Sequence, residues 1–187
     1  MMKPRAFLLI LSLFLLSLPL RAQTNYYQTT KDFHEDGYVY RCETYGGSGY
    51  LQLYNLNNKY IHVSQKYLAT GKNVPMYDMT EEFEKENWTK PKCYSIVNNA
   101  FTKEQTESCR GHTLGIELYI NSETGKVMEV SFDFVNFGPF AYIPVSVFRK
   151  IETQLIEGVW FVPTEGGRKL NYISLYWNQE LGTQIHK

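Results

Sequence analysis

Two runs of alternating apolar and polar side chains between residues 114 and 134 predict a β-hairpin. The apolar positions are Leu114, Ile116, Leu118 and Ile120 in the first run and Met128, Val130, Phe132 and Phe134 in the second. The connecting residues end in Gly125, which can adopt the positive φ that closes many hairpin loops. The pattern therefore predicts two strands whose apolar side chains share one face of a sheet.

A short helix is predicted before this hairpin, over residues 102–110. Thr102 suits the N-cap position, Gln105 stands three residues later as in a capping box, and Gly111 marks the end of the helix. The preceding stretch, residues 80–92, holds four glutamates and then a proline. This composition favours a solvated connector or turn of helix over a carboxylate metal site.

An amphipathic helix and a last strand are predicted after the hairpin. The helix is indicated by apolar residues at helical spacing, namely Val147 or Phe148, Ile151 and Leu155. Gly158 follows this segment, and the apolar stripe is expected to lie on the apolar face of the hairpin. Residues 170–177 alternate once more and predict the closing strand.

The N-terminal part of the chain predicts a small antiparallel meander. Residues 38–43, 50–55 and 59–65 each have the alternation of a strand, and glycine-rich or asparagine-rich turns separate them. The polar segment 23–31 is expected to fray at the N-terminus of the mature chain.

These elements predict an α+β protein with an antiparallel sheet, in which both helices pack on one sheet face. An N-terminal β-meander precedes a C-terminal unit with the order helix, hairpin, helix, strand. The expected organisation is a leader over residues 1–22, a β-rich lobe and connector over 23–92, and an α+β lobe over 93–187. The two lobes are expected to form one compact unit, because no linker of low complexity separates them.

The C-terminal order, together with the GKV segment at 125–127 and the WFVP segment at 160–163, resembles the C-terminal domain of TonB-type energy transducers. The resemblance covers residues 101–177 and implies an edge strand that can accept a strand from a partner. Transducers keep an N-terminal anchor and a long proline-rich spacer, whereas this chain has seven prolines in total. Energy transduction is therefore not expected, and no functional residues are transferred. The whole chain is also similar to a family of small secreted proteins of gram-negative bacteria without assigned function.

The N-terminus has the pattern of a secretory signal peptide. Lys3 and Arg5 precede an apolar run over residues 6–20, and Ala22 supplies the small residue before a cleavage site. The run is shorter than the roughly 20 residues that a membrane-spanning helix needs, although an uncleaved anchor is the alternative. The mature protein is expected to be periplasmic or secreted, without a membrane span once the leader is removed.

Charge and composition exclude several classes of partner. Removal of residues 1–22 would leave 16 basic and 19 acidic side chains, a formal net charge of −3. A mildly acidic chain without a basic run argues against binding to nucleic acid and against docking on anionic lipid. Phosphate-binding loops and dinucleotide fingerprints are absent from the sequence, so no cofactor is predicted.

The three cysteines, Cys42, Cys93 and Cys109, leave alternatives open in an oxidising compartment. A bridge between Cys93 and Cys109 would close a short loop, Cys42 could pair instead, or all three could be buried thiols that pack as small apolar groups. Cys109 and His112 have the spacing of two metal ligands, but a structural zinc site needs four. No metal site is predicted.

Tyrosines supply the candidate binding residues. The chain has fifteen, and those predicted on strands or at their ends are Tyr38, Tyr40, Tyr119, Tyr172 and Tyr176. Such side chains can stack on a sugar or a peptide, although they can equally cover a small core.

These observations predict a non-enzymatic binding module that contacts an envelope protein or a polymer through a sheet edge or a tyrosine-bearing face. One alternative is a small envelope hydrolase that uses a cysteine or paired carboxylates, for which Glu117, Glu129 and Asp133 on the polar face of the hairpin are candidates. Another alternative is an inhibitor of a hydrolase.

Overall fold

Six strands form one antiparallel sheet in a computed structural model that describes residues 24–75, 78 and 80–183. The strands are β1 (Lys31–Glu35), β2 (Tyr38–Thr44), β3 (Tyr50–Asn55), β4 (Thr113–Ile120), β5 (Val127–Val135) and β6 (Ile173–Glu180). Their spatial order is β1-β2-β3-β5-β4-β6, so the sheet is not closed and β1 and β6 form its edges. The predicted α+β class is confirmed. The predicted signal peptide, residues 1–22, lies outside the described residues.

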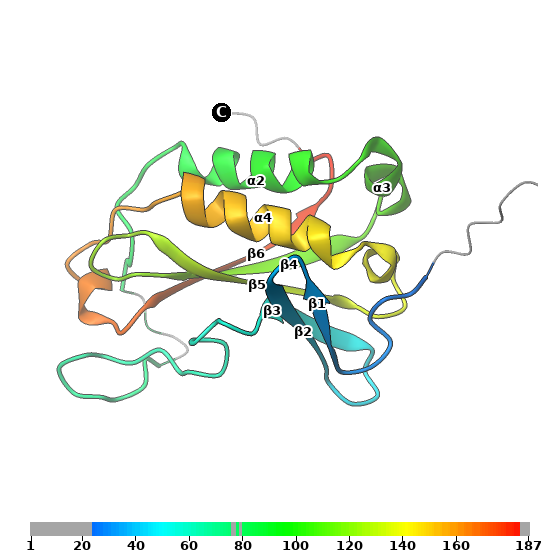
Figure 1. Ribbon diagram of the computed structural model, residues 1–187. Helices are drawn as coiled ribbons and strands as arrows, with labels where there is room; N and C mark the ends of the chain where they lie inside the picture. The colour runs from blue at the N-terminus through cyan, green and yellow to red at the C-terminus, as the bar shows by residue number, and fades with distance from the viewer. Residues whose placement is uncertain (1–23, 76–77, 79, 184–187) are drawn as a thin grey trace, which may run out of the picture.

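Helices α2 (Thr89–Ala100) and α4 (Val145–Gly158) lie side by side on one face of the sheet, and α3 (Lys103–Ser108) follows α2 (Figure 1). Two short 3-10 helices, η1 (Pro139–Tyr142) and η2 (Gly167–Lys169), complete the set. On α4 the side chains of Phe148, Ile151 and Leu155 are fully buried. The predicted packing of an amphipathic helix on the apolar face of the hairpin β4–β5 is therefore confirmed. Within the part of the chain that the structure describes, no helix combines the length and hydrophobicity needed to cross a membrane.

The helical region before the hairpin differs in part from the prediction. α3 begins as expected, because the Thr102 hydroxyl accepts the Gln105 amide and the Gln105 side chain accepts the Thr102 amide. The sequence predicts a connector or a turn of helix over residues 80–92 and no long helix at α2. Pro91 does not interrupt it, because the proline lies in the first turn, where an amide has no partner within the helix. The Glu86 carboxylate accepts the amides of Trp88 and Thr89 and so supplies the missing cap.

The N-terminal meander forms, but with a different set of strands. Residues 59–65, predicted as a strand, belong to a loop, because β3 pairs with β2 on one side and with β5 on the other. The third strand is β1, which follows the segment that was expected to fray. That segment is anchored by Tyr27, which is fully buried and donates its hydroxyl hydrogen to the Ile143 carbonyl at 2.8 Å. The closing strand β6 also begins three residues later than predicted, at Ile173.

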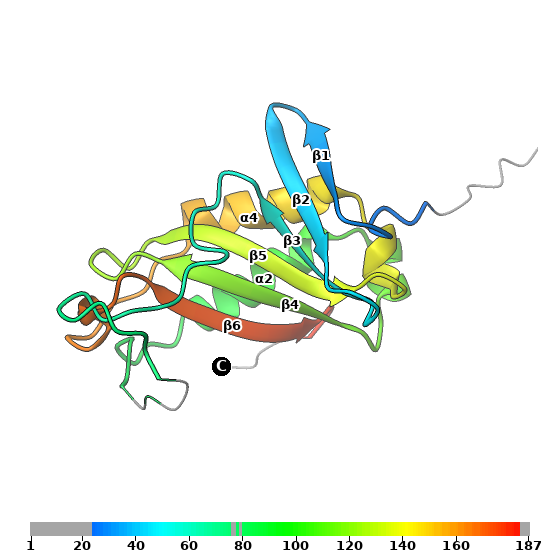
Figure 2. The same ribbon diagram turned by 90° about the horizontal axis from the view of Figure 1, so that it is seen from below.

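The two faces of the sheet have opposite character, because alternate side chains of a strand point to opposite sides. On the face under the helices, registered rows such as Leu53, Phe132 and Ile116 build the core. On the other face, the neighbouring row runs across four strands as Gln52, Asp133, Gly115 and Asn178. We call this second side the polar face. Figure 2 shows it, with the β1–β2 hairpin projecting away from the main sheet.

Candidate functional site

One half of the polar face is covered by a long loop. The covering loop, defined here as residues 56–75, follows β3 and crosses the sheet near the β4–β5 turn (Figure 2). Glu129 of β5, 7% exposed, accepts the backbone amides of Lys59 and Tyr60 at 2.7 and 2.9 Å. A carboxylate that accepts two amides forms strong, charge-assisted hydrogen bonds. This carboxylate is therefore an anchor for the loop, rather than a free acid.

Aromatic rings fill the space between the covering loop and the sheet. Tyr60 of the loop packs against Tyr119 and Tyr172, with ring centroids 6.5 and 4.9 Å away. The Tyr172 hydroxyl donates to the Val63 carbonyl at 2.6 Å. Tyr119 and Tyr172 are 2% and 5% exposed. The covering loop therefore removes two of the predicted binding tyrosines from solvent.

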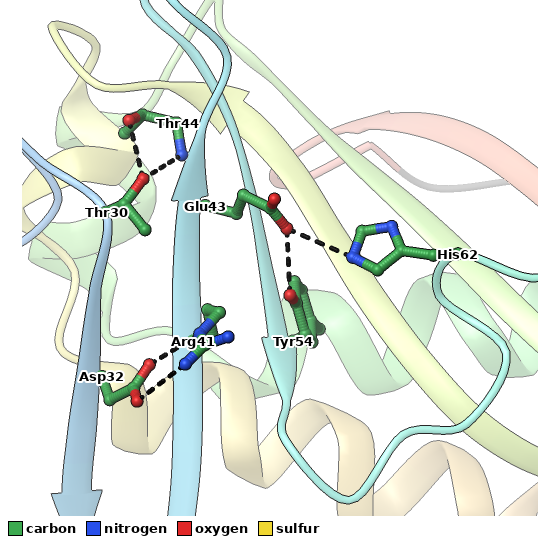
Figure 3. A network of polar contacts seen from close by, with 7 residues as sticks. All are labelled: Thr30, Asp32, Arg41, Glu43, Thr44, Tyr54 and His62. Carbon is green, nitrogen blue, oxygen red and sulfur yellow. Dashed lines mark hydrogen bonds and ion pairs between the residues drawn. The ribbon is translucent and has the colours of Figure 1, made fainter.

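The covering loop is also linked to the meander by a polar network (Figure 3). Glu43 accepts the Tyr54 hydroxyl at 3.0 Å and faces the Nε2 atom of His62, a residue of the covering loop, at 3.3 Å. On the same face, Arg41 forms a bidentate pair with Asp32, with distances of 2.8 and 3.0 Å. This pair holds the pKa of the Asp32 carboxyl below its ordinary value. Because these groups are exposed, each contact adds little stability, and the one that reaches the covering loop is the contact between Glu43 and His62.

Two more predicted binding tyrosines are occupied by contacts with α4. Tyr40 is fully buried and its hydroxyl donates to the carboxylate of Glu152, which is also buried. Tyr38 is half-buried, and the Arg149 guanidinium lies 5.3 Å from the centre of its ring. The alternative, that these tyrosines cover the core, therefore describes Tyr40, Tyr119 and Tyr172. Of the five candidate tyrosines, Tyr176 is the exposed one, with 50% of its surface accessible to solvent.

The other half of the polar face is open and hollowed. A groove of about 630 Å³ lies where β5 ends, between the start of β3 and the turn that precedes β4. We call it the tyrosine groove. Its lining on the polar face includes Tyr50, His112, Thr113, Asp133, Tyr176 and Asn178. Tyr50 is 61% exposed and stands at one side of the groove, while Tyr176 belongs to the strand at the other side.

Gly115 makes room for the Tyr176 side chain beside the groove. This residue lies in the middle of β4, between Asp133 of β5 and Asn178 of β6. A Cβ atom there would collide with the Tyr176 hydroxyl and would come within 3.0 Å of the Asp133 Cβ. Because glycine has no side chain, Tyr176 can lie across the strand, where its hydroxyl donates to Asn178 at 3.2 Å. The missing side chain therefore admits the tyrosine to the groove.

Asp133 is the one acidic side chain of the groove lining. Burial raises the pKa of its carboxyl to about 6, and the negative charge of Glu117 adds to the effect. No described residue donates a hydrogen bond to this carboxylate, whereas Glu117 accepts the hydroxyls of Tyr119 and Ser174. Asp133 is thus a partly buried acceptor whose hydrogen-bonding capacity is available to a ligand.

A second hollow continues the tyrosine groove around Tyr50. It measures about 310 Å³ and is formed by the glycine-rich turn between β2 and β3. Gly49 has a φ of +75° and lies directly against the ring of Phe137, which leaves no room for a side chain. Phe137 and Tyr45 are 72% and 47% exposed. Tyr45, Tyr50 and Phe137 are not among the binding residues predicted from the sequence, although two tyrosines that flank a glycine-rich turn are a visible signal.

The cysteines take no part in the groove. Cys42, Cys93 and Cys109 are all free and buried, so the structure has no bridge between Cys93 and Cys109. The alternative, that the three thiols pack as small apolar groups, describes them. Burial raises the pKa of the Cys93 thiol to about 12 and that of Cys42 to about 11, and it also raises that of Cys109. Buried thiols with raised pKa values are poor nucleophiles.

Among the described residues, no group of three or more His, Cys, Asp or Glu side chains is arranged to hold a metal ion. His112 lines the tyrosine groove and its Nδ1 atom lies 3.2 Å from the Arg110 carbonyl. The groove thus brings together tyrosine rings, one carboxylate, one imidazole and an amide. This set suits the binding of a polar ligand.

The fold and the groove define an α+β protein with an open antiparallel sheet, helices on one face and an aromatic groove on the other. The chain belongs to the family described as a domain of unknown function (DUF5043), whose model matches residues 23–177. The predicted membership of a family without assigned function is thereby confirmed. The resemblance of residues 101–177 to the TonB C-terminal domain stays a prediction.

A crystal structure of a DUF5043 family protein from Bacteroides uniformis ATCC 8492 is similar in both sequence and fold. The two chains are 36% identical, with a TM-score of 0.82, and the match covers 87% of this chain and 91% of that one. No curated protein matches this chain significantly.

Proposed function

We propose that this protein is a non-enzymatic binding module that holds its ligand in the tyrosine groove. The observation that carries the proposal is the exposure of Tyr50 and Tyr176 on either side of one hollow. Large aromatic side chains that stay exposed and cluster around a groove are typical of binding surfaces. The covered half of the same face offers no such surface, because the loop buries its tyrosines.

The proposed location is the periplasm or the exterior of the cell. Its support is the leader pattern of Lys3 and Arg5, the apolar run over 6–20, and Ala22. The ligand would then be an envelope or extracellular molecule. The open outer edges of β1 and β6 could take part in contacts with a protein partner, as strand addition requires an unpaired edge.

Hydrogen exchange locates the binding surface. Amide exchange of the purified protein is measured with and without a soluble envelope extract of the cells that produce it. We expect protection at the start of β3, the end of β5 and along β6, and its loss in the double variant Y50A/Y176A. The control is W160A, which removes an aromatic ring that is 54% exposed and lies beside the β4–β5 turn. Protection confined to other surfaces, or none at all, would reject the proposal.

A hydrolase is the second candidate function, and the raised pKa of Asp133 beside Glu117 favours it. A carboxyl that stays protonated near pH 6 can serve as a general acid. This candidate predicts that the protein shortens a bound polymer chain and that D133N abolishes the cleavage. Chain-length analysis by mass spectrometry tests it, and any cleavage that D133N removes would replace the non-enzymatic proposal.

A further inference from the structure

We propose that the ligand of the tyrosine groove is a neutral carbohydrate chain. This inference rests on the proposed function, because it names the ligand class of the same groove. It is supported by the aromatic rings, the polar row in the groove lining and the charges of that lining.

The aromatic rings suit the apolar side of a sugar ring. A pyranose presents C–H groups on its faces and hydroxyls around its rim, so it packs on an aromatic ring while its hydroxyls reach polar neighbours. Tyr50, Tyr176 and Phe137 are each at least half exposed, so their rings are available as platforms. Tyr50 lines both the groove and the adjoining hollow, so the aromatic surface continues from one to the other.

The polar row provides matching hydrogen-bond partners. Asp133 on β5 and Asn178 on β6 line the groove, and the Tyr176 hydroxyl lies over Gly115 of β4 between them. Neighbouring strands are about 4.8 Å apart, so these groups span roughly 10 Å across three strands. Carboxylate and amide groups offer acceptors and donors, and sugar hydroxyls can use both. A short oligosaccharide laid across the strands would meet one polar group after another.

The charges of the lining favour a neutral ligand. Among the described residues that line the groove and the adjoining hollow there is no lysine or arginine, so an anionic chain would find no opposite charge. Asp133 repels anions as well. A purely apolar ligand would bury this carboxylate without a partner, which is costly. A neutral, hydroxyl-rich molecule meets neither penalty.

An extended peptide fits the groove less well than a sugar chain. Peptides that bind to sheets commonly add a strand to an edge, where unpaired backbone groups provide the affinity. At the groove β5 pairs with β3 and β4 pairs with β6, while the pairing between β4 and β5 ends at Gly115 and Asp133. The backbone left unpaired beyond that point is short, because it comprises only the first residues of β4 and the last residues of β5, and the groove otherwise offers side chains.

Calorimetric titration with defined oligomers tests the inference. The probes are neutral tetrasaccharides of glucose, mannose, galactose and xylose, a galacturonate tetramer as the anionic control, a glucosamine tetramer as the cationic control, and a mixed tetrapeptide library. We expect at least one neutral tetrasaccharide to bind, and Y50A and Y176A each to weaken it at least fivefold. A change of this size, about 1 kcal/mol, is the usual mark of a residue that matters in an interface.

Two variants serve as controls in this titration. W160A removes an equally exposed ring outside the groove and should leave the affinity unchanged. Y50F keeps the ring and should retain most of the affinity, as stacking requires. Preference for a charged tetramer or a peptide, or neutral binding that Y50A and Y176A do not affect, would overturn the inference. If no neutral tetrasaccharide binds while the exchange experiment still shows protection in the groove, the carbohydrate inference fails and the proposed function stands.

Acidification adds an independent readout. The groups that face Asp133 are Glu117 on β4, Tyr176 on β6, Tyr45 in the β2–β3 turn and, along the groove, His112. Protonation of Asp133 removes its negative charge and one of its acceptors, so affinity for the neutral ligand should fall by several fold between pH 7.5 and pH 5. In D133N the affinity should be weak at both pH values. A pH effect that persists unchanged in D133N would contradict the role of Asp133.

Discussion

The covered half and the open half of the polar face are built from the same strands and similar residues, yet they have opposite roles. Glu129 and Asp133 both lie on β5 and both point away from the helices. The Glu129 carboxylate accepts two loop amides, whereas no described residue donates a hydrogen bond to the Asp133 carboxylate. Tyr119 and Tyr176 likewise share the polar face, but one is 2% and the other 50% exposed. The comparison shows that a loop distant in sequence decides which part of a sheet face remains available for binding.

The largest effect is expected from E129A, which breaks the anchor of the covered half. The change leaves the amides of Lys59 and Tyr60 without their acceptor, and the covering loop should loosen. Two charge-assisted hydrogen bonds are lost, so the free energy of unfolding should fall by about 2–3 kcal/mol. Urea denaturation measures it. E123A, on the exposed β4–β5 turn, is the matched control and should change stability by less than about 0.5 kcal/mol.

D133N should raise the free energy of unfolding, whereas E129A lowers it, because the open half contains a carboxylate that folding partly buries. The carboxyl titrates near its ordinary value of 3.8 in the unfolded chain and at about 6 in the native protein. Between these values the native state binds more protons, so stability falls as the pH rises from 4 to 6 and stays lower above it. Removing the charge should raise stability at pH 7 by about 1–2 kcal/mol, after allowance for partial solvation. Urea denaturation of both proteins at pH 4, 5, 6 and 7 measures this effect. If the stability of D133N depended on pH in the same way as that of the parent, the prediction would be wrong.

Y172F and Y176F compare single hydroxyls in the two halves. The Tyr172 hydroxyl bonds to the Val63 carbonyl beneath the loop, while the Tyr176 hydroxyl bonds to Asn178 at the exposed groove. Loss of the first should cost about 1 kcal/mol, because a part-buried hydrogen bond loses its donor. Loss of the second should cost less than about 0.5 kcal/mol, since water replaces it. Equal losses in thermal unfolding would mean that the loop does not shield Tyr172.

The smallest effect on stability is expected from Y50A. The Tyr50 ring is 61% exposed, so its removal should change the free energy of unfolding by less than about 0.5 kcal/mol. Its effect should appear in ligand binding alone. A destabilisation above about 1 kcal/mol would show that Tyr50 supports the fold. The role of Tyr50 in binding would then be judged from Y50F instead of Y50A.

The strands and helices with strong periodicity could be predicted from the sequence. The β4–β5 hairpin, α4 and the capping box of α3 follow from alternation, helical spacing and cap residues that act locally. α2 was missed because Pro91 indicates a helix break in the middle of a helix but suits its first turn. The pattern predicted a strand at 59–65, which is a loop, and did not predict β1. Alternation alone does not reveal which segment finds a neighbouring strand to pair with.

The groove could be predicted only in part. Alternation assigned Tyr119, Tyr176 and the three carboxylates to strands and faces, but it gave no information about what covers a face. The covering loop approaches β4, β5 and β6 from more than fifty residues away in the sequence, and no local pattern shows where it lands. Tyr50 and Phe137 line the same hollow for a similar reason, because the segments that carry them meet only in the folded sheet.

Gly115 illustrates how little separates an open binding face from a closed one. A single methyl group at this position would meet Tyr176 and press on Asp133, while the strand itself tolerates alanine and most other residues. One point mutation is therefore enough to obstruct the groove and leave the sheet and its helices in place. In evolutionary terms, a change at this one position can open or close the groove far more easily than the chain can change its fold.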